Sequence, residues 1–159
     1  FYVRHASGNP AAIDSLVAGS ALAANTWHHV AATFDNTNGE AVLYVNGSST
    51  ATATLAGTPV SSTATVFFGA SGTAPDSPFT GRLDEIRFWS GVRGAAEIAG
   101  GYSSRLTGSE TGLRAYWPLD EGAGSTAADL VAAITATLGT ATAGDAAEPT
   151  WTAESPSIP

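Results

Sequence analysis

Asp84 is the residue of this chain whose position most directly suggests chemistry. If residues 79–90 form one strand, alternation places Asp84 on the same side as Ile86 and Phe88, which is the apolar side. A carboxylate that faces a core is costly unless it is paired or binds a cation. Asp84 is therefore a candidate for binding a cation.

Two alternatives for Asp84 involve no metal. Its carboxylate would pair with Arg82, with Arg87 or with a backbone N–H group. A bulge at Asp84 and Glu85 would instead turn the carboxylate outward and bring Leu83 toward the core.

A second acidic cluster, Asp120-Glu121-Gly122, follows another apolar segment. Asp120 is a candidate metal ligand at a sheet edge. The favoured interpretation is a solvated turn in which the Asp120 carboxylate accepts hydrogen bonds from backbone N–H groups.

Histidine and tryptophan offer weaker indications of a site. His28 and His29 are adjacent in an expected strand, so their imidazoles diverge and do not easily share one ion. Tryptophans can stack on sugars, but their apolar strand contexts favour core anchors; the four are Trp27, Trp89, Trp117 and Trp151.

Catalytic motifs are absent from the sequence. It contains no Gly-x-Ser-x-Gly elbow, no phosphate-binding loop and no dinucleotide-binding fingerprint. A glycosidase needs two carboxylates across a cleft, and no pattern in the chain predicts such a pair. We therefore expect no enzymatic activity and no catalytic residue.

The elements that position these residues are mostly strands. Residues 27–47 predict a hairpin, because Val30, Ala32 and Phe34 alternate before a polar turn and the alternation resumes up to Asn46-Gly47. Residues 49–55 predict a strand with alanines on one face and threonines on the other. Further strands are expected at 1–5, 13–17, 66–69, 79–90, 112–120 and 130–138.

Within the segment 112–120, Trp117 is expected to face inward and Tyr116 outward. A helix of about two turns is expected at 95–99, with Gly94 in place of a capping Ser. This organisation predicts an all-β protein, an antiparallel β-sandwich with one short helix.

Composition limits the partners of the chain. Its 159 residues suffice for one domain, which we expect to span 1–152 with a tail at 153–159. The net charge of −8, with no lysine, argues against nucleic acid and anionic membrane surfaces. No apolar run is long enough for membrane insertion, and no cysteine is present for a disulfide framework. We expect an extracellular or cell-surface protein, and the Ala-, Thr-, Ser- and Gly-rich composition fits a bacterial source.

Three stretches carry a resemblance to a known family: WHHVAATFDNTNGEAVLYVNG at 27–47, GRLDEIRFW at 81–89 and LRAYWPLDEGAGSTAAD at 113–129. Together they resemble the laminin-G-like, or concanavalin A-like, domain. The resemblance implies a concanavalin A-like jelly roll in which the two histidines are structural. It also implies a structural Ca²⁺ at the aspartate that Asp84 matches. The Glu-x-Asp-x-Glu pattern of related glucanases does not occur in this chain.

The order of these stretches departs from the family pattern. The Trp-Pro-Leu-Asp-Glu strand at 117–121 would be expected near the start of such a domain. The chain instead opens at Phe1 just before the middle strands, so that the strands expected to precede residue 1 are missing. Either N-terminal strands belong to a missing segment, or residues 113–152 complete the sandwich. Open sheet edges would favour self-association or pairing with that missing segment.

The function predicted from these observations is that of an extracellular binding or adhesion module without catalytic activity. Carbohydrate is the first ligand expected, by analogy at the level of the fold, and the partner is a glycan or a protein on a surface. One alternative is a structural subunit or spacer of a surface protein or filament that assembles through sheet edges. Another is an accessory domain of a secreted glycoside-active enzyme.

Overall fold

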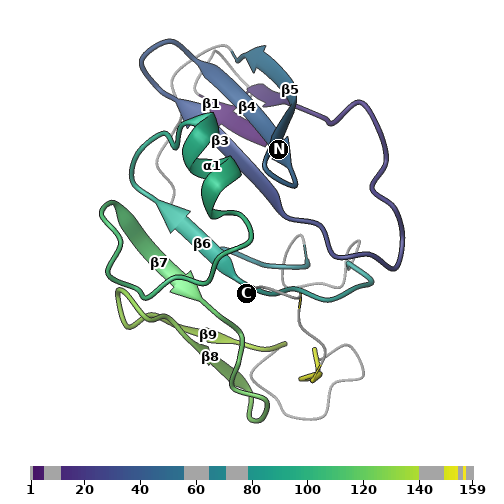
Figure 1. Ribbon diagram of the computed structural model, residues 1–159, viewed down its shortest axis with the longest axis vertical. Helices are drawn as coiled ribbons and strands as arrows, with labels where there is room; N and C mark the ends of the chain where they lie inside the picture. The colour runs from purple at the N-terminus through teal and green to yellow at the C-terminus, as the bar shows by residue number, and fades with distance from the viewer. Residues whose placement is uncertain are drawn as a thin grey trace. The chain divides into compact units, whose positions relative to one another are not determined.

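In the computed structural model of this chain, residues 2–5, 12–55, 65–70, 79–139, 149–153 and 156 are described. The regular elements in these ranges are antiparallel strands and one short helix (Figure 1). No helix in the described ranges is long and apolar enough to cross a membrane.

Two compact units alternate along the chain. The first unit comprises 1–63, 91–104 and 158–159, and the second comprises 64–90 and 105–157. The prediction of a single domain over 1–152 stays a prediction.

The predicted hairpin forms the centre of the first unit. Strands β3 (Val30–Asp35), β4 (Glu40–Val45) and β5 (Ser48–Thr54) pair in the order β3-β4-β5. Gly47 occupies the turn between β4 and β5 with a φ of +79°, and a Cβ there would come within 2.7 Å of the Tyr102 ring. Glycine is therefore required both by the backbone conformation and by the close approach of an aromatic ring.

Apolar side chains on one face of this sheet form a small core. The buried members are Leu16, Ala41, Leu43 and Leu55. Phe34 and the alanines of β5 pack against them, as the alternation predicts. Two further strands, β1 (Tyr2–His5) and β2 (Ala12–Ser15), pair with each other in the same unit.

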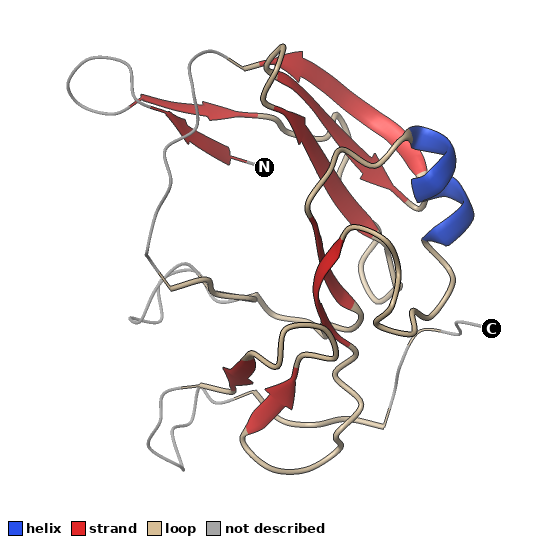
Figure 2. Cartoon of the chain, turned by 90° about the vertical axis from the view of Figure 1, so that its left-hand side faces the viewer, coloured by secondary structure: helices blue, strands red, loops and turns tan. Residues whose placement is uncertain are grey.

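Helix α1 (Ala95–Gly101), drawn in blue in Figure 2, also belongs to the first unit. It contacts β5. Gly94 has no side chain to cap the helix, but its N–H donates to the Glu97 carboxylate over 2.8 Å. This contact replaces part of the missing cap. Ile98 is the buried residue of the helix.

The second unit contains two two-stranded sheets. Strand β6 (Ile86–Trp89) pairs with β7 (Leu113–Trp117), and β8 (Thr126–Ala128) pairs with β9 (Thr135–Thr137). Trp117 lies in the core of this unit, and Trp151 packs against that core and donates to the Gly124 carbonyl over 2.7 Å. Trp117 and Trp151 thus anchor this core, as their sequence contexts predict.

Several strand predictions in the second unit are wrong. The strand expected over 79–90 is regular only from Ile86, because Glu85 adopts a positive φ of 55° that an extended strand excludes. The predicted strand at 66–69 is irregular chain. Tyr116, expected to face outward, is only 1% exposed, because its hydroxyl is bonded to a buried glutamate. The alternative that a bulge would bring Leu83 inward is wrong too, since Leu83 is exposed.

Candidate functional site

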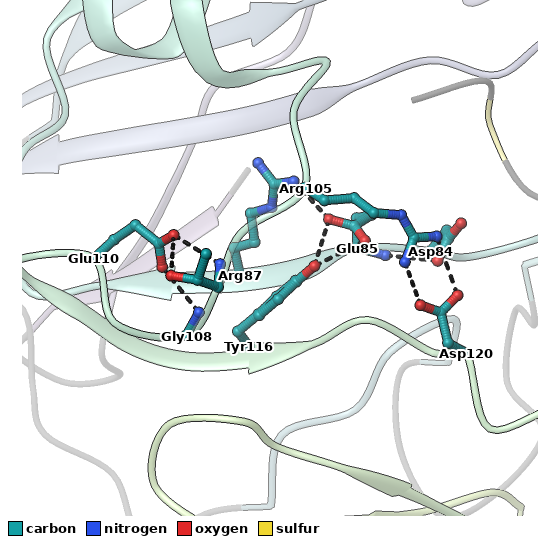
Figure 3. A network of polar contacts seen from close by, with 9 residues as sticks. Asp84, Glu85, Arg87, Arg105, Gly108, Glu110, Tyr116 and Asp120 are labelled. Carbon is teal, nitrogen blue, oxygen red and sulfur yellow. Dashed lines mark hydrogen bonds and ion pairs between the residues drawn. The ribbon is translucent and has the colours of Figure 1, made fainter. Parts of the chain in front are cut away.

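The end of the β6–β7 ladder brings the two predicted aspartates together (Figure 3). Ile86 of β6 pairs with Trp117 of β7, and the strands are antiparallel. Continuing this register two residues beyond Ile86 places Asp84 beside Leu119, which directly precedes Asp120. The negative charge of Asp120 correspondingly contributes to raising the pKa of Asp84. Two carboxylates far apart in sequence thus reach the same end of one ladder.

Beside them, Glu85 is the centre of a buried network. The Tyr116 hydroxyl lies 2.9 Å from each Glu85 carboxylate oxygen, and the Arg87 guanidinium donates to Oε2 over 2.6 Å. The Glu85 and Arg87 side chains are only 8% and 10% exposed. Burial and the Glu85 contact raise the pKa of Tyr116 to about 12, so its hydroxyl stays a donor.

Asp120 forms an ion pair with Arg105, which enters from the segment before β7. Two guanidinium nitrogens contact the two carboxylate oxygens, Nη2 with Oδ1 over 3.2 Å and Nη1 with Oδ2 at closer range. The Arg105 hydrogen bonds hold the pKa of Asp120 below its usual value. The pair is about half exposed, so it forms the solvent-facing rim of the network.

Asp84 is the least satisfied group in the cluster. Its Oδ1 accepts a hydrogen bond from the Glu85 N–H over 3.0 Å. Its Oδ2 is buried and has no hydrogen-bond partner among the described residues. Desolvation, followed by the neighbouring charge of Glu85, raises the pKa of Asp84 to about 6. Of the alternatives left open for Asp84, the described contact to a backbone N–H is the one found.

The loop between Arg105 and β7 is held by one carboxylate. Glu110 accepts hydrogen bonds from the Thr107 N–H over 2.7 Å, from its hydroxyl over 2.9 Å and from the Gly108 N–H over 3.0 Å. These bonds lower the pKa of Glu110. The short chain from Arg105 to β7 is therefore ordered by its own side chains.

A calcium ion in a protein takes six to eight oxygen ligands. Both oxygens of Asp120 accept from Arg105, and Asp84 contributes one oxygen without a partner. No group of three or more acidic or histidine side chains suited to a metal occurs in the described ranges. These donors do not fit a calcium site, and calcium binding at Asp84 and Asp120 stays a prediction.

Sequence reasoning missed the role of Asp129. This buried carboxylate accepts from the backbone N–H groups of Tyr116, Val131 and Ala132 over 2.8–3.0 Å and so links β7 to the chain before β9. The residues that follow Asp129 are apolar, from Leu130 to Ile134, so the sequence offers no turn signal that would have found it.

The histidines of the first unit diverge, as expected. The His28 ring contacts the Ala23 carbonyl over 3.1 Å and the Asn46 side chain over 3.3 Å. The ring of His29 lies 5.7 Å from that of Tyr102. The polar atoms of His28 and Asn46 thus make hydrogen bonds at the end of their own hairpin. These bonds support a structural role for His28.

An exposed apolar surface lies in the second unit around the segment 67–69. Phe79 donates its N–H to the Gly69 carbonyl, and the Leu83 side chain also approaches Gly69. The ring of Phe88 lies 6.0 Å from that of Phe68. Phe67, Phe79 and Phe88 are 40%, 56% and 43% exposed. We call the two exposed side chains beside Gly69, those of Phe79 and Leu83, the aromatic patch. The exposure of Phe88 was not expected, because alternation predicted that it faces inward.

Comparisons with known proteins concern the fold. The family model of the concanavalin A-like lectin/glucanases superfamily matches residues 1–99. A solved structure from Bacteroides ovatus, provisionally named a carbohydrate binding protein, aligns with 23% identity and a TM-score of 0.59. The alignment covers 82% of this chain but 38% of the chain from Bacteroides ovatus. No curated protein matches the sequence.

Proposed function

Because this chain belongs to the concanavalin A-like lectin/glucanases superfamily, we propose that it is a non-catalytic carbohydrate-binding module that acts outside the cell or at its surface. The fold supports carbohydrate binding as the general class of function. The described side chains support a binding surface in the second unit. The provisional name of the Bacteroides ovatus protein agrees with this class.

The observation that carries the proposal is the aromatic patch beside a polar rim. Leu83 of the patch directly precedes Asp84, at the end of the ladder where Arg105 pairs with Asp120. Sugar recognition combines an apolar platform, on which the C–H face of a ring packs, with a few polar groups that fix orientation. Here Phe79 supplies the most exposed ring of the platform, and the half-exposed ion pair supplies donors and acceptors.

Charge favours a neutral glycan over an acidic one. The chain carries a net charge of −8, and both guanidinium groups of the cluster, on Arg87 and Arg105, are already paired with carboxylates. A uronate or sulfate group would therefore approach a surface with no unpaired cation in this cluster.

A non-catalytic role is supported by the state of the carboxylates. Both oxygens of Glu85 accept from Tyr116, and Oε2 also accepts from Arg87. Both oxygens of Asp120 accept from Arg105. A glycosidase needs one carboxylate free to attack or to activate water and another free to donate a proton. These two carboxylates are instead occupied as acceptors of internal hydrogen bonds.

Binding to an array of neutral and acidic glycans tests the proposal. We expect the wild-type chain to bind at least one neutral class. Phe79→Ala should weaken that binding by about tenfold, the loss expected when one stacking aromatic contributes about 1.4 kcal/mol. Gly81→Ala tests the same ring differently, because a Cβ at Gly81 would come within 2.5 Å of the Phe79 ring and displace it.

Trp27→Ala is the matched control, since Trp27 is 36% exposed but belongs to the first unit. It should leave glycan binding unchanged. Wild-type protein that binds no glycan, or binds acidic glycans alone, would contradict the proposal. Equal losses in the Phe79 and Trp27 variants would argue against the aromatic patch as the site.

A structural subunit that assembles through sheet edges is the second candidate. Strand β5 pairs with β4 on one side and, within the described ranges, with no strand on the other. Its exposed residues are the uncharged Ser48, Ser49, Thr50, Thr52 and Thr54. An uncharged edge strand can accept a strand of another copy. Light scattering after size exclusion distinguishes the candidates, because a monomer at all concentrations would reject assembly through β5.

A further inference from the structure

The carboxylates at the end of the β6–β7 ladder outnumber the cations described with them. Asp84, Glu85 and Asp120 gather there, whereas the guanidinium groups belong to Arg87 and Arg105. Arg87 is committed to Glu85 at 2.6 Å. Arg105 is therefore the cation that is left to neutralise the pair of aspartates.

Arg105 acts on both aspartates. It binds Asp120 through two nitrogens, and its positive charge lowers the pKa of Asp84, against the larger effects that raise it. Figure 3 shows the guanidinium reaching Asp120 in the neighbourhood of Asp84. A planar guanidinium binds a carboxylate through two parallel hydrogen bonds. A divalent cation likewise binds both oxygens of a carboxylate, so the two cations compete for the same atoms.

Asp84 and Asp120 do not form a calcium site because most of their carboxylate oxygens already accept hydrogen bonds. The bidentate pair uses both oxygens of Asp120, and the Glu85 N–H uses one oxygen of Asp84. A cation would have to displace Arg105 to reach Asp120, and it would then meet the repulsion of the displaced guanidinium.

We propose that Arg105 serves as the built-in cation of this cluster, so that the domain holds Asp84 and Asp120 together without calcium. Removing the guanidinium leaves three carboxylates and one committed cation. The cluster should then become a site at which Ca²⁺ stabilises the fold. This inference concerns the fold alone and does not depend on glycan binding.

Thermal unfolding at neutral pH tests the proposal. Wild-type protein and Arg105→Gln are each heated in EDTA, in CaCl₂, and in NaCl of matched ionic strength. We expect the wild-type Tm to be the same in EDTA and in CaCl₂. In EDTA, Arg105→Gln should unfold several degrees below the wild type, and CaCl₂ but not NaCl should restore part of the loss.

Two further variants make the outcome specific. Adding Asp84→Asn to Arg105→Gln should abolish the response to calcium, because it removes a charged ligand. Arg114→Gln removes an exposed arginine from the same strand region and should show no calcium response. Arg105→Lys keeps a positive charge, remains available if Arg105→Gln does not fold, and should stay insensitive to calcium.

Either of two results overturns the proposal. A wild-type Tm that falls in EDTA would show that the native domain depends on a bound ion. An Arg105→Gln protein with the same Tm in EDTA and CaCl₂ would show that Arg105 does not occupy the place of a cation.

Discussion

The β3–β4–β5 region and the β6–β7 region differ in how the polar side chains around a small sheet find hydrogen-bond partners. Each is a small antiparallel sheet with a compact apolar cluster on one face. In the first region the polar side chains bind backbone of the same hairpin. Asp35 accepts from Thr37 in its own turn, and Asn46 accepts from the His29 N–H just before β3. In the second region Glu85, Tyr116 and Arg105 form contacts between segments far apart in sequence.

The difference shows where local rules are broken. Glu85 and Leu119 adopt positive φ at the end of the β6–β7 ladder, and Asp84 keeps a buried oxygen without a described partner. Strain and unsatisfied polar groups persist only where surrounding contacts hold them, and they concentrate at functional sites. This is why the candidate site lies in the second region.

The largest expected effect comes from breaking the buried ion pair of the second region. Glu85→Gln removes the charge that compensates the buried Arg87 guanidinium and should lower the free energy of unfolding by about 3 kcal/mol. Glu97→Gln is the counterpart in the first region, where the pair with Arg93 is partly exposed, and it should cost less than about 1 kcal/mol. Urea unfolding measures both, and equal losses would mean that burial does not distinguish the two regions.

A smaller effect is expected from one hydroxyl group. Tyr116→Phe removes the donor that contacts both Glu85 oxygens and should cost about 1.5 kcal/mol. Tyr44 is also buried, but its hydroxyl makes no hydrogen bond with any described residue, so Tyr44→Phe should cost less than about 0.5 kcal/mol. If chemical denaturation ranks the two variants in the opposite order, the network around Glu85 is not a stabilising one.

The smallest effect concerns pH and has opposite signs in the two regions. The pKa of Asp84 is raised to about 6 in the folded protein from 3.8, so its charged form destabilises the fold, and the penalty grows as pH rises from about 4 to 6. Asp84→Asn should therefore raise the Tm by a few degrees above pH 6 and leave it nearly unchanged at pH 4.

Asp35 is the matched control for this titration. Hydrogen bonds from Thr37 lower its pKa, so its charged form stabilises the fold and the contribution is lost as pH falls below about 4. Asp35→Asn should lower the Tm at neutral pH, and the difference should shrink on acidification. A pH series of melting curves that shows the same sign for both variants would contradict the assignment of Asp84 as a destabilised carboxylate.

Much of the first region was predictable from the sequence, because its contacts are local. The alternation around Val30 and Leu43, the turn at Asn46-Gly47 and the alanine face of β5 all follow from neighbours in the chain. The helix near 95–99 was predictable for the same reason, although its cap through Glu97 depends on a contact that the pattern did not single out.

The second region was less predictable, because its polar partners come from separate segments. Tyr116 was expected to face solvent, because alternation around Trp117 does not show that Glu85, which directly precedes β6, binds its hydroxyl. Asp84 and Asp120 were both recognised as candidates, but their meeting depends on the β6–β7 register, and Arg105 was not expected between them.

The sequence by itself determined the class of fold, the superfamily and the negative net charge, because periodicity, turn residues and charge act over short distances or as sums. The tertiary structure alone decided which carboxylates are neutralised and by which partner. That choice depends on burial and on distances between atoms, which strand register sets and local sequence does not.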